Sequence, residues 1–306
     1  MGEKLTPEMV GVEDPRVKYI NHPENLGERK NLNSLLECAG GRFFTWQFDD
    51  DYYASDYTKK IINIIARHPD LNCVFTSYKK VFSEELDSSG IDQEDDDGMV
   101  LSGRVFLRSY WKRKIRAMGF TAAFRTNYLQ ALGGVMALSS GPYALFSEYV
   151  LLFNAAKEDA VGYVKSPQVY YYVHNASWSN VNSELSLYEE SGINLLRESQ
   201  KIFQDRALVQ DIDYNMAHVV KLVFHEYAKK VSLKSGLTFM KDLRDFFDRD
   251  LVQYFVRERR ITFLLRMKLL LIRWKWSIVP ILKTKTKKIV HGNALIRLLK
   301  VHAEFQ

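Results

Sequence analysis

Three consecutive carboxylates, Asp49, Asp50 and Asp51, follow a segment rich in aromatic residues that predicts a buried strand over residues 42–48. Three adjacent negative charges repel one another unless a cation offsets them, and Mg²⁺ or Mn²⁺ prefers such oxygen ligands. Open α/β sheets bind ligands at the carboxyl ends of their strands. A metal ion here could bridge a carboxylate and the oxygens of a nucleotide diphosphate. On these residues alone, a solvated acidic turn is an equal alternative.

The elements that would position this acidic turn alternate between strand and helix. Residues 17–20 predict a short strand, and leucines at helical spacing predict a helix over residues 28–39 that Gly40 and Gly41 end. A helix from Ser55 or Asp56 to about Arg67 and a strand over residues 72–78 follow. This order predicts a parallel α/β sheet.

Further elements of both kinds are expected downstream. Residues 83–98 predict an acidic surface loop, residues 119–134 a further unit with a helix over 126–132, and residues 146–157 a second helix. Two strands are predicted over residues 161–164 and 168–173. Beyond residue 183 the pattern is wholly helical, near 185–205, 210–233, 236–255 and 259–279. We therefore predict two domains, residues 1–182 and a helical extension over residues 183–306.

Several motifs occur together in one order over roughly residues 15–180. They are Asn25-Leu26-Gly27 with Asn31 and Asn33, Ala39-Gly40-Gly41 before Arg42-Phe43-Phe44, Phe48-Asp49-Asp50-Asp51 with Ser55-Asp56, Gly119 to Arg125, Leu132-Gly133-Gly134, Ser147-Glu148, and Tyr170-Tyr171-Tyr172-Val173-His174 with Ser177. This succession resembles family 2 glycosyltransferases. The resemblance implies a GT-A fold, which is a Rossmann-like α/β sheet, and transfer of a sugar from a nucleotide-diphosphate donor to a glycan or lipid-linked acceptor.

The resemblance also implies roles for particular residues. Glu148 lies where the family has its catalytic base, which takes the proton of the acceptor hydroxyl in an inverting displacement. His174 lies where a histidine could ligate the metal or contact the diphosphate. The metal set is therefore Asp49, Asp50, Asp51 and His174, with Mn²⁺ or Mg²⁺. The residues expected to bind the donor are Asn25, Gly27, Arg29, Lys30, Asn31, Asp49 and Asp50.

The family has an opening strand, a helix and a second strand before the part matched here, and about sixteen residues precede Val17. We therefore expect a sheet that lacks its first strands, with weak or absent donor binding by this chain alone. The alternative function is a non-catalytic truncated remnant that binds glycan, membrane or a partner protein.

Charge is distributed unevenly along the chain. Residues 257–306 hold 13 Lys or Arg against Glu258 and Glu304, a balance of +11, which leaves −5 for the rest of a chain of net charge +6. An acidic body with a basic tail suits an anionic membrane surface at least as well as nucleic acid, and no nucleic-acid partner is expected. Residues 261–282 are apolar but contain four Lys or Arg, so we expect them to lie on a bilayer or pack on the core rather than span the membrane.

The compartment is predicted from the two cysteines and the first residues. Cys38 and Cys73 have no spacing typical of a metal site or a disulfide framework, which predicts a reducing cytoplasm. Residues 1–14 lack the apolar run of a secretory signal peptide. We expect a cytoplasmic protein, peripheral at the inner face of the plasma membrane if the tail binds it.

Overall fold

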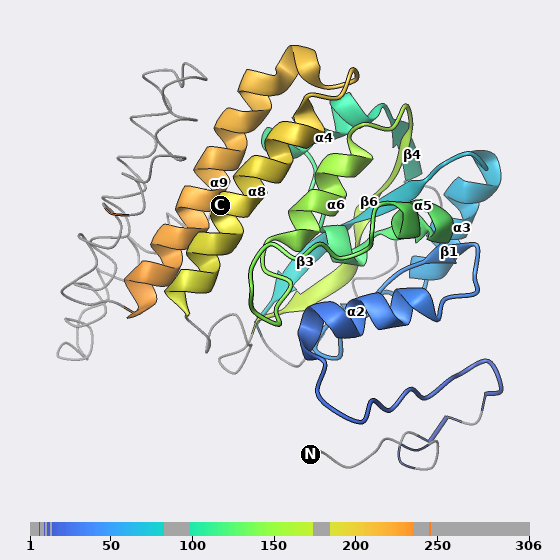
Figure 1. Ribbon diagram of the computed structural model, residues 1–306. Coiled ribbons are helices and arrows are strands. Elements are labelled where there is room, and N and C mark those ends of the chain that lie inside the picture. Colours follow the sequence, from blue (N-terminus) through green and yellow to red (C-terminus); the bar gives the residue numbers. More distant parts are fainter. Residues whose placement is uncertain are drawn as a thin grey trace, which may run out of the picture. The chain divides into compact units, whose positions relative to one another are not determined.

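The computed structural model describes residues 14–82, 98–173 and 184–234, with residues 6, 9, 11, 12 and 245 (Figure 1). The chain divides into two compact units, Met1–Tyr172 and Val173–Gln306. The domain boundary predicted at residue 182 falls in a segment outside the described residues and stays a prediction. Each unit is described by itself below.

A mixed six-stranded sheet forms the centre of the first unit. Its strands are β1 (Phe43–Phe44), β2 (Tyr52–Tyr53), β3 (Cys73–Val81), β4 (Gly98–Leu101), β5 (Ala123–Arg125) and β6 (Val161–Tyr172). The order is β1-β5-β3-β6-β2, and β4 also pairs with β6. Only β3 and β6 run parallel, while the other pairs are antiparallel. Along its second edge, β6 pairs first with β4 and then, at its C-terminal end, with β2.

An irregularity in β6 changes which of its side chains face each side of the sheet. Thr76 pairs with Val164, but Ser77 pairs with Pro167 and Tyr78 with Val169. Three residues of β6 are therefore added relative to β3. Because side chains alternate along a strand, an odd addition inverts the facing of every later residue in β6.

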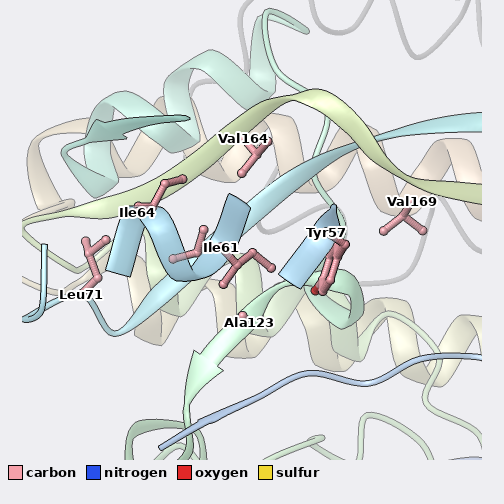
Figure 2. Close-up of a cluster of buried hydrophobic side chains, with 8 residues drawn as sticks. Tyr57, Ile61, Ile64, Leu71, Ala123, Val164 and Val169 are labelled. Carbon is pink, nitrogen blue, oxygen red and sulfur yellow. The ribbon is translucent and has the colours of Figure 1, made fainter. Parts of the chain in front are cut away.

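The helices of the first unit cover both faces of this sheet. They are α2 (Gly27–Glu37), α3 (Tyr57–Arg67), α4 (Gly103–Trp111), the short 3-10 helix η2 (Gly119–Thr121), α5 (Thr126–Ala131) and α6 (Ser147–Ala155). On one face, α3 packs Tyr57, Ile61 and Ile64 against Val164 and Val169 of β6 (Figure 2). On the other, the buried rings of Phe75, Phe106 and Phe124 lie against one another. Phe75 has Phe106 at 4.7 Å and Phe124 at 5.7 Å.

The second unit contains α8 (Leu185–Phe203), the 3-10 turn η3 (Val209–Asp211) and α9 (Ile212–Lys234). The two helices pack against each other, and the Lys230 ammonium lies 4.8 Å from the centre of the Tyr188 ring. Helices predicted over residues 185–205 and 210–233 are confirmed. Those predicted over 236–255 and 259–279 lie outside the described residues, as does the basic tail. Among the helices that the structure describes, none has the length and apolarity needed to cross a membrane.

Four sequence-based expectations about the first unit are wrong. Residues 17–20 form no strand, because Val17 and Ile20 remain exposed and no neighbouring strand pairs with them. The strand predicted over residues 42–48 is limited to β1, because Trp46 leaves the sheet to donate its indole N–H to the carbonyl of Leu32. The two strands predicted between residues 161 and 173 are one continuous β6. The sheet is mixed rather than parallel, because the strands predicted before and after α3, β1 and β3, point the same way but are separated by β5, which runs antiparallel to both.

Candidate active site

The acidic turn Asp49–Asp51 lies between β1 and β2, so a short irregular segment separates it from the end of β1. Asp49 and Asp50 are exposed, whereas Asp51 is 9% exposed. Asp51 Oδ1 accepts a hydrogen bond of 3.2 Å from the backbone N–H of Tyr172, the last residue of β6. Burial, with a smaller contribution from the charges of Asp50 and Asp49, raises the pKa of Asp51 to about 6 despite that hydrogen bond.

Aromatic side chains hold the segment that leads into this turn. The Trp46 indole N–H donates to the carbonyl of Leu32 in α2, at 3.1 Å. The rings of Trp46 and Phe48 lie 5.6 and 5.8 Å from the ring of Phe120 in η2. These contacts fix the backbone immediately before Asp49 against both α2 and η2.

Glu148 is in the first turn of α6 and is partly buried. The helix begins after Phe146, whose backbone is left-handed at φ 61°, and Ser147 donates its hydroxyl to the carbonyl of Met136 at 2.7 Å. Gly119 of η2 lies directly against the backbone of Glu148, because a Cβ at Gly119 would be 2.2 Å from the Glu148 carbonyl oxygen. Phe48, the residue before the acidic turn, and the backbone of Glu148 therefore both contact the 3-10 helix η2.

A tyrosine on β3 lies in the electrostatic field of Glu148. Burial raises the pKa of Tyr78, the Glu148 carboxylate raises it further, and Arg116 lowers it. Tyr78 pairs with Val169 of β6, which in turn pairs with Tyr53 of β2, two residues after Asp51. Three adjacent strands thus connect the acidic turn to the neighbourhood of Glu148. Sequence analysis missed Tyr78, and nothing in its local sequence distinguishes it from a core tyrosine.

The loop before α2 holds the chain against the segment before α6. Asn25 Oδ1 accepts from the backbone N–H of Gly27 at 2.9 Å, and Gly27 has φ 74°. A Cβ at Gly27 would lie 2.4 Å from Pro142 Cβ, so a side chain is excluded there on two grounds. Glu28 Oε2 accepts from the backbone N–H of Ala144 at 3.0 Å. Asn25 and Gly27 therefore position the segment that leads to Glu148.

The other residues expected at the donor site differ in their surroundings. Asn31 and Lys30 are exposed on α2. Arg29 is partly buried, its backbone N–H donates to Pro142, and its side-chain Nε is buried without a hydrogen-bond partner. Asn33, the second member of the spaced asparagine pair, makes two hydrogen bonds to the backbone of Val135, at 3.0 and 2.8 Å. Asn33 is thus a packing residue.

The predicted metal set is only partly visible. His174 lies outside the described residues, although the described chain brings Tyr172, two residues earlier, to Asp51. In the described part of the chain, no three His, Cys, Asp or Glu side chains are grouped so that they could hold a metal ion. Mg²⁺ is commonly held by one or two carboxylates with substrate phosphates and water, so the acidic turn can supply part of such a ligand set.

Comparison with known proteins identifies the class. The sequence model of glycosyl transferase family 2 matches residues 3–146, a segment that contains the acidic turn and ends two residues before Glu148. Over this segment, just under half of the chain, the sequence matches glycosyl transferase family 2. The predicted α/β fold of GT-A type with a helical C-terminal part is confirmed.

Similar solved structures include three of TarS from S. aureus, each 13% identical over 76% of this chain. The structure of residues 1–349 in complex with UDP-GlcNAc is covered over 72% of its length with a TM-score of 0.42. Residues 1–349 alone are covered over 72% with a TM-score of 0.36. A further TarS structure is covered over 44% with a TM-score of 0.40. No curated protein matches the chain.

Proposed function

We propose that the chain transfers a sugar from a nucleotide-diphosphate donor to a hydroxyl of a glycan or lipid-linked acceptor, in a metal-dependent reaction with inversion at the anomeric carbon. The observation that carries the proposal is that the residue before the acidic turn and the backbone of Glu148 both contact η2. The match of residues 3–146 to the model of glycosyl transferase family 2 supports the reaction class.

Glu148 is the proposed base. Its carboxylate takes the proton of the acceptor hydroxyl while the hydroxyl oxygen forms a bond to the anomeric carbon and the bond from that carbon to the diphosphate oxygen breaks. One displacement on the face opposite the leaving group inverts the configuration. The close packing of Gly119 against the Glu148 backbone fixes the backbone position from which this carboxylate extends.

The donor's diphosphate is proposed to lie at the acidic turn, with Asn25, Gly27, Arg29, Lys30 and Asn31 on its other side. Asp49, Asp50 and Asp51, with His174, would hold Mn²⁺ or Mg²⁺. Burial raises the pKa of Asp51 most, and the neighbouring charges of Asp50 and Asp49 add to it; a cation would offset both effects on its carboxylate. When bound, the ion supplies positive charge to the departing diphosphate.

Single substitutions test these roles through two measurable steps, hydrolysis of a nucleotide sugar and transfer of its sugar to a glycan. Glu148→Gln should lower transfer by about 10²–10⁴-fold, the usual contribution of a general base. Asp49→Asn should weaken the response of both steps to added Mn²⁺. Glu37→Gln, at an exposed position on α2, is the matched control and should leave both steps unchanged.

The outcomes separate the proposal from its rival. NMR of the product should show the anomer opposite to that of the donor, and retention would overturn the inverting mechanism. If the chain neither binds nor turns over any nucleotide sugar in the presence of Mn²⁺ or Mg²⁺, the chain is the non-catalytic binding protein considered above.

We also propose that the basic tail, residues 257–306, brings the enzyme to the cytoplasmic face of an anionic membrane. The charge balance of +11 in that segment supports this placement. Deleting residues 257–306 should abolish binding to phosphatidylglycerol vesicles, and unchanged binding would remove the proposal.

A further inference from the structure

A strongly basic loop follows α4. Its cationic residues are Lys112, Arg113, Lys114 and Arg116, and all four are exposed. They lie in a stretch, residues 98–147, that contains seven Lys or Arg and no Asp or Glu. Among the residues that the structure describes, no ion pair involves these four cations. The loop therefore presents positive charge that its described surroundings do not neutralise.

Both ends of the basic loop are held by specific contacts. Trp111, the last residue of α4, packs its ring 5.6 Å from that of Phe153 in α6. Arg116 is fixed through its backbone, because its N–H donates to the Tyr163 hydroxyl and that hydroxyl donates to its carbonyl, at 3.2 and 3.1 Å. Arg113 is left-handed at φ 58°, a conformation that few residues other than glycine adopt. The loop thus has a defined course that leaves its side chains exposed.

The course of the loop brings its charge to the proposed base. Three residues after Arg116 the chain reaches Gly119, which abuts the backbone of Glu148. Three residues span at most about 11 Å, so the Cα atom of Arg116 lies within that distance of the residue that abuts Glu148. The pKa of Tyr78 agrees with this proximity, because the charges of both Glu148 and Arg116 act on its phenol. Glu148 is also the first acidic residue in the sequence after the acid-free stretch.

We propose that the basic loop binds the acceptor, and that the acceptor is an anionic polymer whose phosphate or carboxylate groups flank the hydroxyl presented to Glu148. This inference rests on the proposed function, since it names the substrate class of that site. Four exposed cations on one short loop match a chain with repeated negative charges better than a neutral glycan.

The loop suits a polymer better than a bilayer. Between Lys112 and Arg116 the one apolar residue is Ile115, which is partly buried. Peripheral membrane segments combine basic residues with exposed apolar side chains that enter the interface. The basic loop offers charge without such side chains.

The test measures binding of labelled polyphosphate and polygalacturonate by the full chain at 50 and 200 mM salt. Neutral dextran, phosphatidylglycerol vesicles and single-stranded DNA are the comparison probes. The loop variant combines Lys112→Gln, Arg113→Asn, Lys114→Gln and Arg116→Gln, with asparagine chosen because it tolerates the left-handed backbone. The matched control removes the same charge at four exposed positions, through Lys18→Gln, Lys59→Gln, Lys165→Gln and Arg206→Gln. Thermal unfolding checks that both variants fold.

Wild-type protein should bind one of the two polyanions and not dextran. By analogy with single-stranded nucleic acids, four cationic contacts weaken binding by on the order of 50-fold between the two salt concentrations. The loop variant should lose about this much of the salt dependence and keep the part that the basic tail contributes, and the control should keep all of it. Equal weakening in both variants, unchanged binding in the loop variant, or tighter loop-dependent binding to vesicles or DNA than to either polyanion would each overturn the inference. Nucleotide-sugar hydrolysis without any acceptor is measured separately on wild-type protein, so failure of the proposed function is recognised independently.

Discussion

Replacing Asp51 by Asn should make the protein more stable at pH 8 and leave its stability nearly unchanged at pH 4. An aspartate in the unfolded chain has a pKa near 3.8, whereas that of Asp51 in the fold is about 6. As the pH rises between these values, the unfolded state loses a proton that the folded state retains, so the wild-type protein loses stability. Asparagine does not titrate, and its Oδ1 can still accept from the N–H of Tyr172.

The magnitude follows from the two pKa values. Each pKa unit corresponds to about 1.4 kcal/mol, so ionised Asp51 costs up to about 3 kcal/mol above pH 6. Urea unfolding at pH 4 and pH 8 measures the free energy of unfolding of both proteins. Asp70→Asn, at an exposed turn, is the control and should shift neither value by more than about 0.5 kcal/mol. If Asp51→Asn changed stability by the same amount at both pH values, the desolvation argument would be refuted.

Three further predictions concern packing. Asn33→Ala should lower the free energy of unfolding by about 1–3 kcal/mol, measured by urea denaturation, because both backbone groups of Val135 lose a partner. Gly119→Ala should reduce transfer activity more than it reduces the melting temperature, because the new methyl group displaces the start of the helix that carries Glu148; equal loss of both would contradict this. Cys73 should react with a thiol reagent only on unfolding, because burial raises its pKa, while the exposed second cysteine reacts at once in a kinetic thiol titration.

Local patterns predicted the helices well and the strand pairing poorly. The apolar spacing in residues 28–39 and 56–67 is sufficient to predict α2 and α3 within about two residues. Gly40 and Gly41 follow α2, yet neither is left-handed, so the helix ends without the glycine cap that the sequence predicted. Strand partners depend on contacts distant in sequence, and β4 and α4 were missed altogether because no clear periodicity marks them.

The candidate site was predicted through motif order more than through physical pattern. The sequence indicated Asp49–Asp51 and Glu148, but not that the first two aspartates would be exposed while Asp51 turns inward to Tyr172. That difference depends on where β6 ends, which is a property of the assembled sheet. The aromatic contacts of Phe120 likewise join segments more than seventy residues apart.

Because three residues are added to β6 relative to β3, the side chains of β6 after the irregularity face the opposite side of the sheet from the one that regular alternation would give. Val164 and Val169 are separated by an odd number of positions, yet both enter the same core beneath α3. Removing one residue between them would turn the final tyrosines over, so that Val173 rather than Tyr172 would stand where the backbone amide meets Asp51. A chain shortened by one residue here would keep all its motifs. It would still lose the match between the end of β6 and the acidic turn. The number of residues between 164 and 169 therefore matters more for the position of the acidic turn than which residues they are.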